Sequence, residues 1–188
     1  MKEIIIIAGA NGSGKTTFSK PLIAETTYAF LNADEIEREL DTPDTAGSKL
    51  KAGRLFFQRL DELMNAGQGF ILESTLAGKY LVKVIENAKN KGYSVSIVYV
   101  FLENPQICLE RISARVKNGG HDIPKEDVIR RYYRSKENFW LLYKNLADDW
   151  LLYFNGLQII QQVATGKGEI YEIEHELLFE KYLDDIKI

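Results

Sequence analysis

Cysteine and long apolar runs are scarce in this chain of 188 residues. Cys108 is the one cysteine, which excludes an intramolecular disulfide and a zinc site built from several cysteines, and makes a reducing compartment the simplest setting. No apolar run approaches the ~20 residues of a membrane-spanning helix, so we expect no membrane partner. Met1 to Glu3 are followed by only four isoleucines before glycine, too few for a secretory signal. We therefore expect a cytoplasmic protein.

Proline is also rare, and no linker, repeat or low-complexity stretch interrupts the chain. Four prolines are spread over the whole length, which predicts a single domain over residues 1–188. With 45% apolar and 27% charged residues, the composition is that of an ordinary folded protein. The net charge of −3 speaks against general nucleic-acid coating, which requires a basic domain, so we consider nucleic acid an unlikely partner.

Short apolar runs alternate with segments of helical spacing. Ile4 to Ile7 form a β-branched run that fits a strand buried on both faces of a parallel sheet. A helix follows from about Gly14, and Pro21 should end or kink it. Further strands are expected at 28–31, 70–72, 93–102 and 150–154, and helices at 35–40, 47–65, 81–90, 105–116 and 124–145. This alternation predicts an α/β fold with a mainly parallel central sheet flanked by helices.

The C-terminal residues 157–188 are expected to form an appendage. Residues 157–163 make either a hairpin with 150–154 or a separate edge strand, because Asn155 and Gly156 part the two runs. A turn is expected at 165–168, followed by a strand and then a helix.

A phosphate-binding motif follows the first strand. Residues 9–16 read G-A-N-G-S-G-K-T and match G-x-x-x-x-G-K-[ST] at every fixed position. Glycines let successive N–H groups point at phosphate oxygens, and the helix that follows directs its positive end at the same anion. We expect ATP or GTP phosphates to contact Ala10, Asn11, Gly12, Ser13, Gly14, Lys15, Thr16 and Thr17. A glycine-rich turn without a ligand is the alternative.

Two acidic residues lie where strands of the predicted sheet end. Asp34 could accept the proton of an acceptor hydroxyl or orient that hydroxyl, although an Asp there could equally cap a helix. Glu73, beside Ser74 and Thr75, could hold Mg²⁺ with Thr16 or bind substrate hydroxyls. A capping role or a solvated turn is the alternative for Glu73.

Positive charge gathers in residues 111–136, the cationic segment. It holds eight basic and three acidic residues, a net charge of +5, so that the remaining chain carries −8. Gly119 and Gly120 provide a hinge between two expected helices, and His121 lies in that hinge. A hinged, positively charged helical pair suits a lid over nucleotide phosphates, and a solvated helix face with a nucleic-acid contact is the alternative.

Taken together, the blocks at 8–17, 32–36, 73–76, 115–124 and 130–132 resemble the zeta toxin family of P-loop kinases, from residue 3 to about residue 155. The resemblance implies a P-loop NTPase fold with a helical lid, and a nucleoside triphosphate with Mg²⁺. In toxin members the acceptor is UDP-N-acetylglucosamine, and an epsilon-type antitoxin blocks the site. By motif match Lys15 would bind phosphates and Thr16 the metal, with Asp34 as the base. Glu73 and Thr75 would contact the acceptor, and Arg115 would stabilise the transferred phosphoryl group.

The cationic segment departs from that family in one place. Toxin members carry a second phosphate-contacting arginine just before the proline that opens the helix after the hinge, where this chain has His121 or a near neighbour. Arg130 or Arg131 could substitute from the helix. We therefore expect Lys15, Asp34, Arg115 and Arg131 as catalytic residues, with His121 among the substrate contacts.

The expected function is an ATP-dependent kinase of a small-molecule hydroxyl, with a nucleotide sugar as acceptor and an antitoxin as a candidate partner. Three alternatives remain from the sequence: a kinase of another metabolite or nucleoside, a nucleotide-dependent binding module without a toxin role, and a nucleic-acid end kinase.

Overall fold

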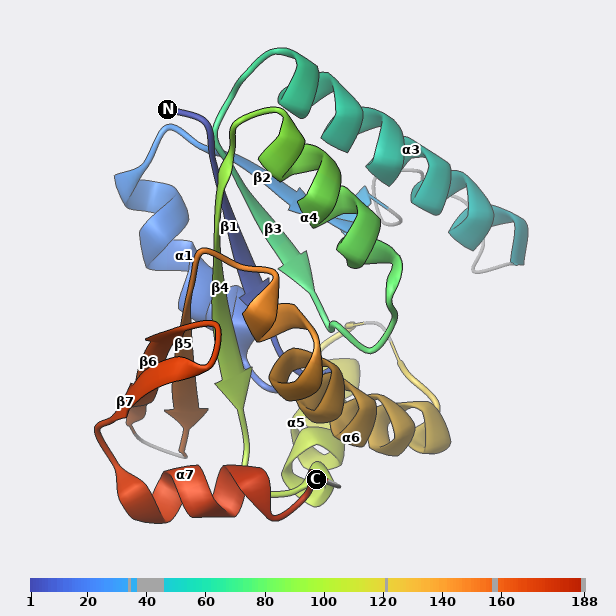
Figure 1. Cartoon of the computed structure of the whole chain (residues 1–188). Coiled ribbons are helices and arrows are strands. Elements are labelled where there is room, and N and C mark those ends of the chain that lie inside the picture. The colour runs from blue at the N-terminus through green and yellow to red at the C-terminus, as the bar shows by residue number, and fades with distance from the viewer. Residues whose placement is uncertain (34, 37–45, 121, 157–158, 187–188) are drawn as a thin grey trace.

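A seven-stranded sheet forms the centre of the structure (Figure 1). The structure, a computed structural model, describes residues 1–33, 35–36, 46–120, 122–156 and 159–186. The strands are β1 (Glu3–Ala8), β2 (Ala29–Asn32), β3 (Phe70–Ser74), β4 (Ser94–Phe101), β5 (Asp149–Asn155), β6 (Ile160–Lys167) and β7 (Ile170–Ile173). Their order is β2-β3-β1-β4-β5-β6-β7, with parallel pairing from β2 to β5 and antiparallel pairing of β6 and β7. The predicted mainly parallel α/β fold is confirmed.

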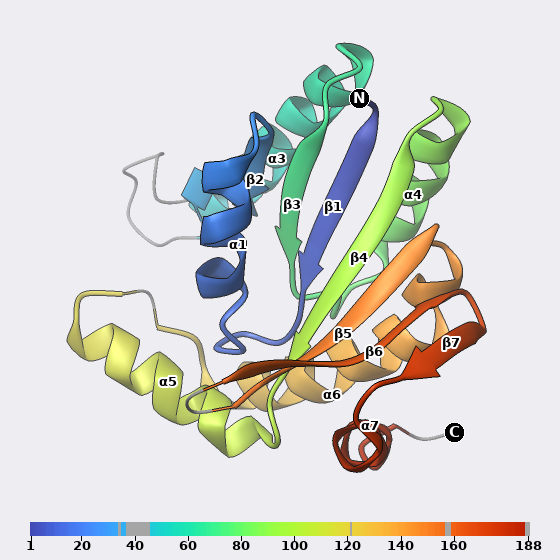
Figure 2. The ribbon, with the colours of Figure 1, turned by 90° about the vertical axis from the view of Figure 1, so that its left-hand side faces the viewer.

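The isoleucines of β1 bury both faces of the sheet. Ile4 and Ile6 pack with α3 (Ala46–Asn65) and α4 (Tyr80–Asn90), whereas Ile7 packs with α1 (Lys15–Glu25) on the other face. Figure 2 shows α1 and α4 on opposite sides of the sheet. Because side chains alternate along a strand, a one-residue shift of β1 would exchange its two faces, so this burial fixes the register.

Pro21 does not end the first helix. α1 continues to Glu25 with Pro21 inside it, so of the two expected effects, an end or a kink, the end is wrong. Proline removes one hydrogen bond from a helix interior, at a cost of about 3 kcal/mol. Phe18, Leu22 and Ile23 pack against the sheet on both sides of the proline, and this burial offsets that cost.

The C-terminal residues extend the central sheet. β6 pairs with β5 and β7 pairs with β6, which favours the hairpin among the two expected arrangements. The turn expected at 165–168 is wrong, because β6 continues to Lys167, which pairs with Ile170. Only Gly168 and Glu169 remain in the turn, and Gly168 takes a φ of 56°. The predicted strand and helix of the tail are confirmed as β7 and α7 (Glu176–Leu183).

Two helices follow β4 on the carboxyl side of the sheet. α5 (Pro105–Lys117) begins as predicted, with Asn104 Oδ1 accepting a hydrogen bond from the Ile107 N–H at 3.1 Å. α6 (Lys125–Leu141) ends before the expected Asn145, because a 3₁₀ turn takes over at Tyr143–Asn145. Across the part of the chain that the structure describes, every helix is too short or too polar to cross a bilayer.

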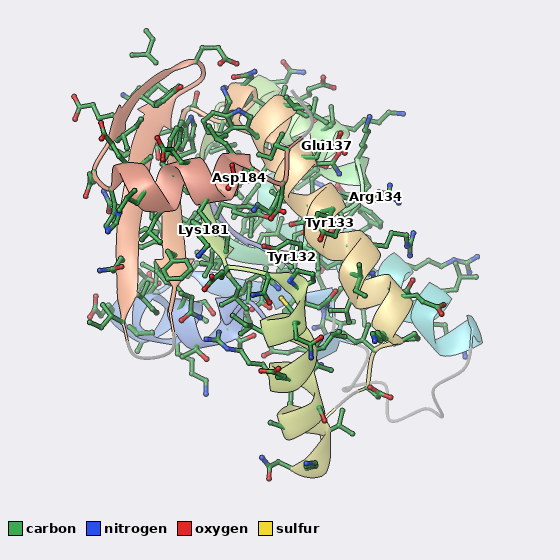
Figure 3. The ribbon with its side chains drawn as sticks, turned by 90° about the horizontal axis from the view of Figure 1, so that it is seen from below. Tyr132, Tyr133, Arg134, Glu137, Lys181 and Asp184 are labelled. Carbon is green, nitrogen blue, oxygen red and sulfur yellow. The ribbon has the colours of Figure 1, made fainter. Side chains whose placement is uncertain are left out.

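A buried lysine ties α6 to the C-terminus. The Lys136 side chain is 1% exposed, and its Nζ lies 2.6 Å from Asp185 Oδ2. Tyr182 donates a hydrogen bond to the Lys136 carbonyl at 3.1 Å. Burial lowers the pKa of Lys136, and the Asp185 carboxylate opposes that effect. Figure 3 shows α7, which carries Lys181 and is followed directly by Asp184, lying beside α6.

We predict that Asp185→Asn lowers the free energy of unfolding by about 3 kcal/mol, because it leaves the Lys136 ammonium buried without a counter-charge. Urea denaturation measures this loss. Asp184→Asn is the matched control, since it removes the neighbouring, exposed carboxylate and should change stability by less than about 0.5 kcal/mol. Equal effects of the two variants would contradict the prediction.

Candidate active site

The register of the parallel strands brings the predicted site segments together. Ala8 lies opposite Ser74 of β3 and Tyr99 of β4, and Asn32 of β2 lies opposite Glu73. The loop after β1 therefore leaves the sheet between the ends of β3 and β4. α5 and α6 lie at this same end, toward which the arrows of β1 and β4 point (Figure 1).

Hydrogen bonds to one carbonyl close the phosphate loop, residues 9–16. Ala10 O accepts hydrogen bonds from the Ser13 N–H at 3.1 Å and from Lys15 Nζ at 3.0 Å, so the loop closes on itself through a carbonyl. Gly14 precedes α1 without a side-chain cap. The first N–H groups of a helix have no partner inside the helix, and such a terminus favours an anion.

Gly12 lets the phosphate loop pass close to α5. Its φ is 80°, and a Cβ at this position would lie 2.8 Å from the Cys108 carbonyl oxygen. Burial raises the pKa of the Cys108 thiol to about 11, although the charges of Lys15 and Arg111 act in the opposite direction. Cys108 is therefore a neutral packing residue beneath the loop, as its position within a helix suggests.

Thr16 and Glu73 form the oxygen-rich part of the site. Thr16 Oγ1 donates to the Glu73 carboxylate, 3.1 Å from Oε1 and 3.0 Å from Oε2. A hydroxyl and a carboxylate are the hard oxygen donors that Mg²⁺ prefers. This pair, which the sequence predicts as the metal site, therefore fits that ion.

Two adjoining hollows share part of their lining. The larger cleft has a volume of about 450 Å³, and the smaller pocket one of about 140 Å³. Asn11, Lys15, Asn32 and Glu73 line both. The larger cleft is completed by Gly12, Gly14, Thr16, Thr17, Arg111, Ile112, Arg115, Asn155 and Gly156. The smaller pocket is completed by Ala33, Ser74, Thr75, Tyr80 and Arg131.

α6 and the 3₁₀ turn that follows it hold the loop at the edge of the smaller pocket. Ser135 donates to the Thr75 carbonyl, and Asn138 Nδ2 donates to the Leu76 carbonyl at 2.8 Å. The Tyr143 hydroxyl donates to the Gly78 carbonyl at 2.6 Å. Leu76 has a φ of 55°, which is strained for a residue with a side chain. These hydrogen bonds stabilise the loop in that conformation.

Of the two arginines proposed to replace the missing family arginine, Arg131 reaches the site. Its Nη1 lies 3.3 Å from Asn11 Oδ1, in the phosphate loop. Its Nη2 also lies 3.6 Å from Asp127 Oδ2, whereas the exposed Arg130 lies 2.7 Å from the other oxygen of that carboxylate. The cationic segment is anchored at its end, because Tyr132, Ser135 and Lys136 are buried.

Asp34 and His121 lie outside the described residues, so their expected roles stay predictions. The sequence reasoning did not single out Arg111, Asn155 and Tyr80. Arg111 was counted within the cationic segment, which is the one signal that pointed to it. The sequence marks Asn155 only as a turn residue and gives no signal for Tyr80, because the positions of both depend on contacts across the fold.

Comparison with known proteins identifies the family. The family model described as Zeta toxin matches residues 1–174. The chain belongs to the zeta toxin family. An uncharacterized protein of Haemophilus influenzae strain Rd is 31% identical over 130 residues, which are 69% of this chain and 92% of that protein.

Solved structures show the same fold in this zeta toxin family member. A chain of the AvrRxo1-ORF1:-ORF2 complex with ATP matches with a TM-score of 0.77 at 17% identity, covering 97% of this chain and 63% of that chain. The chain thus spans less than two thirds of that relative. The PezAT chromosomal toxin–antitoxin system of Streptococcus pneumoniae matches with a TM-score of 0.66 at 18% identity, covering 95% of this chain and 76% of that chain. The predicted P-loop kinase fold is confirmed, and family and fold together support an ATP-dependent kinase.

We predict that Gly12→Ala weakens ATP binding at least tenfold, since its Cβ would push the phosphate loop away from α5. Calorimetric titration with ATP measures this loss. Gly92→Ala is the matched control: Gly92 has a φ of 78° and open space around its Cβ, so it shares the backbone strain without the close contact. Equal ATP affinities of the two variants would contradict the role of this contact.

Proposed function

We propose that this member of the zeta toxin family transfers the γ-phosphate of ATP to a hydroxyl of a small molecule, with a nucleotide sugar such as UDP-N-acetylglucosamine as the acceptor. One observation carries the proposal: the larger cleft and the smaller pocket share Asn11, Lys15 and Glu73. A triphosphate in the cleft and a hydroxyl in the pocket would therefore meet at these residues.

The phosphate loop and three cationic side chains would hold the donor. Lys15, which now donates to the Ala10 carbonyl at 3.0 Å, is close enough to turn to the β- and γ-phosphates. Arg111 and Arg115 approach the same cleft from α5. Positive charge around the transferred group stabilises the negative charge that spreads over its oxygens.

Thr16 and Glu73 would hold Mg²⁺, which neutralises phosphate charge and orients the phosphates when it is bound. Glu73 also lines the smaller pocket, so the same carboxylate would lie beside the acceptor. This double position agrees with the two roles predicted for Glu73 from the sequence.

The acceptor would lie against the end of β2 and the loop after β3. Thr75 lines the smaller pocket, and Ala33, which also lines it, directly precedes Asp34. We propose Asp34 as the group that accepts the hydroxyl proton. Arg131, which also lines the smaller pocket, would contact the phosphoryl group as it passes to the acceptor.

We also propose an antitoxin as a protein partner. The pneumococcal relative is named as part of a chromosomal toxin–antitoxin system. The cationic lining of the larger cleft, with Lys15, Arg111 and Arg115, would suit an acidic inhibitory segment as well as phosphates.

We predict that the protein adds one phosphate to UDP-N-acetylglucosamine in the presence of ATP and Mg²⁺, and that Asp34→Asn abolishes this product while ATP still binds. An amide cannot accept the hydroxyl proton, so transfer should fall at least a hundredfold. Mass spectrometry of the acceptor and calorimetry of ATP binding measure the two effects.

A wild-type protein that binds ATP without phosphorylating this acceptor would remove the nucleotide sugar from the proposal, and a screen of metabolite and nucleoside acceptors would follow. Transfer by Asp34→Asn at the wild-type rate would remove Asp34 from the mechanism. Lys15→Ala with unchanged ATP affinity and turnover would contradict the role of the phosphate loop.

We predict that Glu73→Gln raises the Mg²⁺ concentration needed for half-maximal transfer about tenfold, because a neutral amide is a weaker ligand for a divalent cation. A magnesium titration of the transfer rate at constant ATP measures the shift. Glu86→Gln on the exposed side of α4 is the control with the same charge change. An unchanged magnesium requirement of Glu73→Gln would place the metal elsewhere.

A further inference from the structure

The end of β5 is bonded to the phosphate loop. Asn155, the last residue of β5, donates a hydrogen bond from Nδ2 to the Ser13 carbonyl at 2.7 Å, although 142 positions separate the two residues. Figure 2 shows the end of β5 approaching α5 and the loop between β1 and α1. This contact reaches the part of the loop from which phosphate-binding N–H groups are expected.

The bond to Asn155 sets the orientation of one peptide group. No cis peptide bond occurs among the described residues, so the Ser13–Gly14 peptide is trans and its N–H points away from its carbonyl. Holding the Ser13 carbonyl toward Asn155 therefore directs the Gly14 N–H to the opposite side. The Ser13 side chain does not help to orient this peptide, because its buried hydroxyl has no hydrogen-bond partner among the described residues.

The place that Asn155 occupies exists because residue 14 is glycine. A Cβ on Gly14 would lie 2.2 Å from Asn155 Nδ2, and the φ of Gly14 is 95°. Arg111 supports Asn155 from the other side, since its Nη2 lies 3.4 Å from the Asn155 carbonyl and 3.3 Å from the Gly156 carbonyl. The asparagine is thus held on its backbone side and bonded through its side chain.

We propose that Asn155 is a positioning residue for phosphate binding: it orients the Ser13–Gly14 peptide so that the Gly14 N–H meets the triphosphate. The inference rests on the proposed function in one respect, that the larger cleft binds a triphosphate. It adds a residue outside the phosphate-loop motif and couples the β5–β6 hairpin to the affinity for phosphates.

A different role for Asn155 would be to contact the nucleobase, since the residue also lines the larger cleft. The two roles predict different ligand dependence. A positioning residue affects every ligand with a phosphate chain, including inorganic tripolyphosphate, which has no base. A residue that contacts the base affects ATP alone.

The experiment measures the binding of MgATP and of magnesium tripolyphosphate by calorimetry, and ATP and acceptor KM values in the transfer assay. The variants are Asn155→Ala, which removes the donor, and Asn155→Asp, which keeps the size but replaces the donor by a charged acceptor. Gln161→Ala, an exposed amide on β6 of the same hairpin, is the matched control. Lys15→Ala is the reference for a lost phosphate contact.

We expect Asn155→Ala to lower the affinity for both ligands about tenfold, because one oriented hydrogen bond to the phosphates would be lost. Asn155→Asp should lower both affinities further, because the negative charge of the new carboxylate repels phosphate. The ATP KM should rise in parallel, with the acceptor KM, the turnover at saturating ATP and the urea midpoint of the free protein unchanged. Gln161→Ala should match the wild type.

Both Asn155 variants could bind tripolyphosphate with wild-type affinity while Lys15→Ala loses affinity for it. That result would overturn this inference and leave the proposed function standing. Weakening of ATP but not of tripolyphosphate would also overturn it, in favour of a contact with the base. A lowered urea midpoint with equal weakening of ATP and acceptor would show a merely structural role. A wild type that binds neither phosphate ligand would overturn the proposed function and this inference together.

Discussion

The parallel pairing of β1 with both β3 and β4 is the constraint on which the site depends. It places the phosphate loop between two other strand ends and sets Glu73 within hydrogen-bond distance of Thr16. The pairing holds because Ile4, Ile6 and Ile7 are buried on the two faces of the sheet. Apolar burial, which has no chemical role of its own, therefore fixes the geometry of the charged groups that would act on phosphate.

α6 connects the core to the loops around the smaller pocket. Arg131, Ser135 and Asn138 are spaced by four and three residues, so they lie on one face of the helix. All three donate to the loops around the site, whereas Tyr132 and Phe139 are buried in the core on a neighbouring face. The later turns of α6 are therefore fixed both to the core and to the loops around the site.

Local patterns carried most of what could be predicted from the sequence. The phosphate loop, the Asn104 cap and the strands of β-branched residues depend on neighbours within a few positions, and spacing shows them directly. The bond from Asn155 to the Ser13 carbonyl depends on the pairing of β5 with β4, 142 positions from the loop. The continuation of α1 past Pro21 depends in the same way on packing against the sheet. Such contacts leave no local trace in the residues that make them.

Three cations of the site donate hydrogen bonds to neutral oxygen atoms, and Arg131 also lies 3.6 Å from Asp127 Oδ2. Lys15 donates to the Ala10 carbonyl, Arg131 to the Asn11 amide oxygen, and Arg111 to the carbonyls of residues 155 and 156. These bonds already hold the side chains near the cleft, so little side-chain entropy would be lost when a ligand binds. A phosphate oxygen carries negative charge, and charge-assisted hydrogen bonds are roughly twice as strong as those to neutral acceptors. A hydrogen bond to a phosphate oxygen would therefore be stronger than each of these bonds to a neutral acceptor, and the side chains that make them already lie at the site.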